Sequence, residues 1–187
     1  GDIYGCVHDH DLGASMFGAV WTRFGTASLM SNGGELSDSM PVPMSMNNGA
    51  TNGGGTIAGF YVNMLNQQHG YVVRDGMLEP YDPTSTTSLT AIWDMNTSQH
   101  FVGTYRESGE AAARRHAFVQ SSDGAAAVTF DFTCQEVDGC AGGASFGTVA
   151  FATVAFGISP DGVVVGQYVI VSGGAIHAFV AIPPDTE

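Results

Sequence analysis

The stretch Asn96-Thr-Ser-Gln-His-Phe-Val-Gly103-Thr-Tyr105, followed by Arg115-His116-Ala-Phe-Val119 and Asp123-Gly124, decides the fold because its pattern recurs. A second copy runs from Asn52 to Tyr61 and continues with His69-Gly-Tyr-Val-Val73 and Asp75-Gly76. A third runs from Ser159 to Tyr168 and continues with His177-Ala-Phe-Val180. Runs of β-branched and aromatic residues, separated by glycine and Asp-Gly pairs, are typical of strands joined by hairpin turns.

The most complete copy predicts a meander of four antiparallel strands at residues 89–95, 99–106, 115–120 and 127–132. Approximate repeats cover residues 1–33, 40–83, 89–133 and 148–182, within one domain of 187 residues. The first repeat lacks an equivalent of the first strand, and the last lacks an equivalent of the fourth. Repeats of this length predict an all-β, small β-propeller-like fold of about four four-stranded blades. An open stack of sheets or a barrel is the alternative.

The order of these motifs resembles the HAF repeats of bacterial extracellular proteins. Three His-[Gly/Ala]-aromatic strands carry the resemblance, and Tyr81-Asp82 and Phe130-Asp131 complete two of the copies. The resemblance covers most of residues 52–182. It implies an exported, propeller-like protein and attaches no general activity to it. The first repeat departs most from the pattern.

The composition limits the partners of the chain. The formal net charge is −13, with 5 Lys and Arg against 18 Asp and Glu. Nucleic acid is excluded as a partner, because its binding depends on basic side chains that neutralise phosphates. We expect no membrane span, since no apolar run is long enough. A small molecule, a glycan or a protein remains as ligand, and a homodimer fits the incomplete end repeats.

The expected location is extracellular or periplasmic. Low lysine content with abundant Asp, Gly, Ser and Thr is common in exported bacterial proteins. The first residues lack the basic and apolar regions of a signal peptide, so we expect a mature or trimmed form. In an oxidising compartment Cys134 and Cys140 are candidates for a local disulfide, and unpaired thiols are the alternative.

The repeated histidines His69, His116 and His177 are candidate ligand-binding residues, because they begin equivalent strands. One interpretation is a shared metal or ligand ring on the propeller axis. The other is structural: a ring nitrogen ties each blade to the backbone of its neighbour. We favour the structural interpretation, since a role repeated in every blade is usually packing.

The tract His8-Asp9-His10-Asp11 has no counterpart in the other repeats. On a strand, His8 and His10 share one face and Asp9 and Asp11 the other. Two imidazoles on one face can hold a divalent metal, with a carboxylate or water completing the shell. An exposed polar loop is the alternative interpretation of this tract.

Two functions follow from these motifs. The first is an exported, non-catalytic binding or adhesion module. Trp21 and Trp93, with the strand tyrosines, could line a sugar-binding face, although core packing accounts for such residues equally well. The second is a metal-dependent enzyme, a hydrolase, whose metal at His8 and His10 activates a water.

Overall fold

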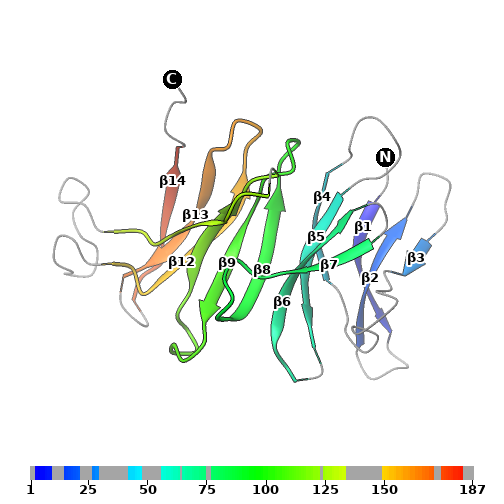
Figure 1. Ribbon diagram of the computed structural model, residues 1–187, viewed down its shortest axis with the longest axis horizontal. Helices are drawn as coiled ribbons and strands as arrows, with labels where there is room; N and C mark the ends of the chain where they lie inside the picture. Colours follow the sequence, from blue (N-terminus) through cyan, green and yellow to red (C-terminus); the bar gives the residue numbers. More distant parts are fainter. Residues whose placement is uncertain are drawn as a thin grey trace.

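The computed structural model (Figure 1) is all-β, as predicted: its described residues form fourteen strands and no helix. Most neighbouring strands are antiparallel and consecutive in the chain. The described residues are 3–9, 15–21, 27–29, 42–47, 56–63, 65–74, 77–122, 124–133, 149–170 and 174–182.

The strands form three sheets that follow one another in a row (Figure 1). The first sheet contains β1 (Ile3–Asp9), β2 (Ser15–Trp21) and β3 (Ala27–Leu29). The last sheet contains β12 (Ala152–Ile158), β13 (Val164–Val169) and β14 (His177–Ala181). Figure 1 shows these two sheets at opposite ends of the molecule, on either side of an eight-stranded sheet.

The eight-stranded sheet consists of two antiparallel meanders, which are called the second and third meanders because they correspond to the second and third sequence repeats. The second meander contains β4 (Val42–Asn47), β5 (Thr56–Val62), β6 (Gln68–Arg74) and β7 (Met77–Tyr81). The third meander contains β8 (Thr87–Met95), β9 (Phe101–Glu107), β10 (His116–Gln120) and β11 (Val128–Phe130). One parallel pair, Gln68 with Leu89, joins them. Pro43 is accommodated in β4 because this strand lies at the sheet edge.

A β-bulge interrupts β4, β8 and β12 at one equivalent point, opposite a glycine of the next strand. A Cβ atom at Gly103 would lie 2.1 Å from the carbonyl oxygen of Ala91 and 2.7 Å from the Phe118 ring. A Cβ atom at Gly59 or Gly166 would lie 2.0 or 2.1 Å from the equivalent carbonyl oxygen. The recurring glycines are therefore required by close backbone approach.

The recurring polar residue at the start of the pattern caps a turn. Asn96 Oδ1 accepts hydrogen bonds from the backbone N–H groups of Ser98 and His100, both at 3.0 Å. Its Nδ2 donates to the carbonyl oxygen of Ser159, 3.1 Å away, which occupies the same turn of the last sheet. Ser159 Oγ likewise accepts from Val163 N at 2.9 Å. Each polar side chain thus closes its own hairpin, and Asn96 also links two neighbouring sheets.

The core lies between neighbouring meanders. Phe118 of β10 packs with Ala58 and Val72 of the second meander. Phe179 of β14 packs in the same way with Val102 and Ala117 of the third meander. All of these side chains are buried. In these two His-x-aromatic strands the aromatic residue therefore fills a site of small and β-branched residues on the preceding meander.

Asp94 of β8 connects the first strands of the second meander, the third meander and the last sheet. Its Oδ1 accepts from Ser45 Oγ of β4, and its Oδ2 accepts from Ile158 N of β12, both at 3.0 Å. Beside it, Trp93 packs edge-on between Phe60 and Phe156, with centroid distances of 6.0 and 5.8 Å. This arrangement holds β4, β8 and β12 next to one another.

The described strands do not form a closed barrel or ring. The coarse fold prediction is therefore confirmed, and closure into a propeller stays a prediction. A turn closed by a hydrogen bond from Arg114 N to Ala111 O, at 2.9 Å, precedes β10.

We predict that Gly103→Ala lowers the free energy of unfolding by about 3 kcal/mol, because the added methyl group overlaps backbone and a packed ring. Urea unfolding of the two proteins measures this difference. Gly109→Ala is the control: Gly109 has a φ of +88° but open space around its Cβ position, so only the backbone strain of about 1 kcal/mol is expected. Equal losses in the two variants would contradict the close-approach explanation.

Candidate functional site

Each of the three repeated histidines stacks on the tyrosine opposite it in the neighbouring strand. The pairs are Tyr61 with His69, Tyr105 with His116, and Tyr168 with His177. The centroid distances are 5.5, 5.0 and 5.3 Å, with interplanar angles of about 30° in every case. Burial, followed by the nearby Asp82 carboxylate, raises the pKa of Tyr61.

The ring nitrogens of two of these histidines bind side chains of their own meander. His69 Nδ1 lies 2.8 Å from Asp82 Oδ2, and His116 Nδ1 lies 2.9 Å from Asp131 Oδ2. The opposite nitrogen of His69 contacts Asn63 Nδ2, at 3.3 Å. The expected bond to a neighbouring blade's backbone is therefore corrected: the aspartate that ends each meander is the partner.

The aspartate then carries the connection to the next meander. Thr90 of β8, fully buried, donates its hydroxyl to Asp82 Oδ1 at 2.5 Å. At the following junction the equivalent Thr153 accepts from Phe132 N at 3.0 Å, and its own N–H donates to Arg115 O at 2.9 Å. The His69–Asp82 pair thus lies where the second meander meets the third, and the His116–Asp131 pair lies where the third meander meets the last sheet.

His116 belongs to a charged cluster at the junction with the last sheet. Its Nε2 lies 2.9 Å from Glu110 Oε1, and Arg114 contacts Asp131 Oδ2 at 2.9 Å. Arg114 also donates to the carbonyl oxygen of Ala150. Burial acts to raise the pKa of Glu110, but hydrogen bonds from His116 and from the Glu107 N–H outweigh it and hold this pKa below its usual value.

Within the described ranges, no group of three His, Cys, Asp or Glu side chains could hold a metal ion. His116 does not form one with Asp131 and Glu110, because they contact opposite nitrogens of its ring. The tract 8–11 is only partly described: β1 extends through His8 and Asp9, whose backbones pair with Met16 and Ser15. His10, Asp11, Cys134 and Cys140 lie outside the described residues. The N-terminal metal site and the disulfide therefore stay predictions.

A pocket of about 240 Å³ lies between strands β6 and β7 of the second meander and the connection from β10 to β11. Tyr81, Phe101 and Gln120 form its inner wall, and Arg74, Glu79 and Ser122 lie at its rim. The Tyr81 hydroxyl donates to Gln120 Oε1 at 2.9 Å. Gln120 Nε2 in turn donates to the carbonyl oxygens of Ser121 and Ala125, at 2.9 and 2.7 Å. These bonds fix the wall in place.

The pocket combines aromatic surface with uncharged polar groups. Burial, and then the Asp82 carboxylate, raises the pKa of Tyr81, so its hydroxyl remains protonated at neutral pH. At the rim Arg74 forms an ion pair with Glu79 at 3.3 Å, and both side chains are well exposed. Paired charges and fixed polar groups beside aromatic rings suit a small, neutral, polar ligand.

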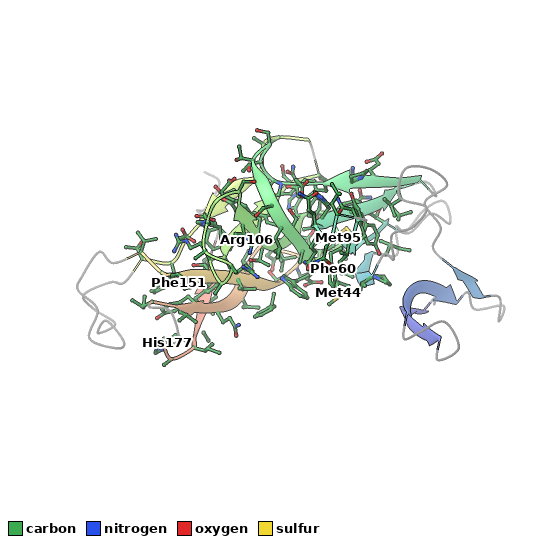
Figure 2. The ribbon with its side chains drawn as sticks, turned by 90° about the horizontal axis from the view of Figure 1, so that it is seen from below. Met44, Phe60, Met95, Arg106, Phe151 and His177 are labelled. Carbon is green, nitrogen blue, oxygen red and sulfur yellow. The ribbon has the colours of Figure 1, made fainter. Side chains whose placement is uncertain are left out.

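Sequence reasoning singled out Tyr81 only as part of a repeat and missed Gln120. These residues are 39 positions apart and belong to different meanders, so no local pattern joins them. Of the strand tyrosines considered for sugar binding, Tyr61, Tyr71 and Tyr105 are buried and Tyr168 is partly buried against Phe132, in agreement with core packing. In Figure 2, Phe60 and Met95 lie in the middle of the molecule, whereas His177 lies on the last sheet.

Comparison with known proteins gives no match to a family model, a curated protein or a solved structure. No helix in the described part of the chain has the length and apolar character needed to cross a membrane.

We predict that the junction bond between Asp82 and Thr90 contributes about 1 kcal/mol of coupling energy, because both groups lose water on folding. A double-mutant cycle with Asp82→Ala and Thr90→Val, followed by urea unfolding, measures this coupling. Glu79→Ala paired with Thr90→Val serves as control and is expected to be additive within about 0.5 kcal/mol. Additivity in the Asp82 cycle as well would show that the junction bond is not formed.

We also predict a pH-dependent contribution from Glu110. Its folded-state pKa lies below the usual 4.5, so the stabilisation is complete above about pH 4.5 and disappears as the pH falls through the folded value. Glu110→Gln should therefore lower stability at pH 7, by less than about 1 kcal/mol for this partly exposed group. Denaturant unfolding at several pH values tests this, and an unchanged gap between wild type and variant near pH 3 would contradict it.

Proposed function

We propose that the protein is an exported, non-catalytic binding module with propeller-like blades, and that its pocket at Tyr81 and Gln120 binds one sugar unit of a glycan. The pocket is the observation that carries the proposal. Its volume of about 240 Å³ is below the roughly 300 Å³ at which pockets for drug-sized ligands begin, so it suits a single ring.

The chemistry of the wall supports a sugar in particular. A pyranose has an apolar face of C–H groups and an edge of hydroxyl groups. Tyr81 supplies aromatic carbon, while the second lone pair of Gln120 Oε1 and the Ser122 hydroxyl supply hydrogen-bonding positions. The net charge of −13 disfavours anionic ligands, and the paired Arg74 and Glu79 add no net charge at the rim.

The lining residues also support a binding role rather than glycoside hydrolysis. That reaction ordinarily uses two carboxyl groups facing each other across the bond to be cleaved. Among the described residues that line this pocket, Glu79 is the one carboxylate, and it is paired with Arg74. Export is supported by the acidic composition and by the resemblance to extracellular repeats.

A glycan array followed by titration calorimetry tests this function. We expect a neutral glycan to bind, and Ser122→Phe to weaken its binding at least about tenfold by filling the pocket mouth. Ser98→Phe is the matched control: Ser98 is also exposed but lies in the turn between β8 and β9, so its affinity should equal that of the wild type. Thermal unfolding verifies that both variants are folded. Absence of any glycan ligand, or equal affinity in the two variants, would refute the proposal.

A further inference from the structure

The last sheet has one covered face and one open face. The face carrying Thr153, Ala155 and Phe179 packs on the third meander. The opposite face carries Val165 and Val180, which are directly opposed in β13 and β14. Their exposed fractions are 45% and 66%, so two neighbouring β-branched apolar side chains meet water on this face of the sheet.

The same positions are covered in the two preceding meanders. In the third meander, the residues equivalent to Val165 and Ala178 are Val102 and Ala117, both 0% exposed because Phe179 of the last sheet packs on them. In the second meander, Ala58 and Val72 are covered by Phe118. The open face therefore continues an interface that the chain already forms twice, and it has the residue types that such an interface requires.

The open face also lacks charge. The strands β12, β13 and β14 contain no Asp, Glu, Lys or Arg, although the chain carries a net charge of −13. Two copies repel each other through most of their surfaces, because each is strongly acidic. A contact through this sheet buries apolar area without desolvating a carboxylate.

Figure 1 shows the first and last sheets at opposite ends of the row, so the chain's own first sheet does not cover this face.

We propose that a second copy of this chain covers the open face, forming a homodimer in which the two last sheets pack face to face about a twofold axis. Such a contact is self-complementary, since Val165 and Val180 of each copy meet the same surface of the other. It does not depend on the pocket at Tyr81, which lies between the second and third meanders.

Sedimentation equilibrium of the whole protein tests this dimer, from about 1 to about 500 µM. We expect the mass to rise from 19.4 kDa towards twice that value. Val180→Asp should weaken the dimer about 100-fold or more, because an unpaired carboxylate would be desolvated on each side of the axis. The residue is exposed in the single chain, so the variant should fold, as circular dichroism and thermal unfolding will verify.

Leu65→Asp is the matched control, because Leu65 is 78% exposed and lies in the turn between β5 and β6, away from the last sheet. The dimer of the Leu65→Asp variant should be as stable as that of the wild type. A wild-type chain that stays monomeric up to 500 µM, or a dimer that persists in a folded Val180→Asp variant, would overturn the proposal. So would a dimer that Leu65→Asp disrupts to the same extent.

Discussion

The packing of an aromatic ring over a glycine is the interaction on which the rest of the structure depends. Phe118 lies over Gly103 and Phe179 over Gly166, in each case where the preceding strand forms a bulge. Because the glycine has no Cβ, the ring can lie flat on its own sheet and still reach the preceding meander. A single local contact thereby determines the strand pairing and the contact between successive sheets.

Hydrogen bonds to carboxylates complete these junctions. Asp82 accepts from both His69 and the buried Thr90, and Asp94 accepts from β4 on one side and β12 on the other. The donors Thr90 and Ile158 are buried, and a buried donor without an acceptor costs free energy, so each junction is specific for its partners. The hydrogen bonds of His69 and His116 make them part of the scaffold, and the pocket proposed to bind a ligand lies elsewhere, between the second and third meanders.

The strands of the third meander could be predicted because their signals are local. Alternating apolar residues and the Asp-Gly turn at 123–124 indicate strands and hairpins within a few positions. The partner of His116 could not be predicted, because Asp131 approaches it only after β11 folds back on β10. The pocket was missed for the same reason: Tyr81 and Gln120 meet only when two meanders lie side by side.

By itself, the sequence determined the all-β class and the meanders, because turn conformation and alternation depend on neighbouring residues. Only the tertiary structure decided which residues line the pocket, which are buried in the core and which stay exposed. Val102 and Val165 occupy equivalent positions in the pattern, yet one is 0% and the other 45% exposed. The difference is the presence of a following sheet, and burial depends on what packs against a side chain rather than on its own strand.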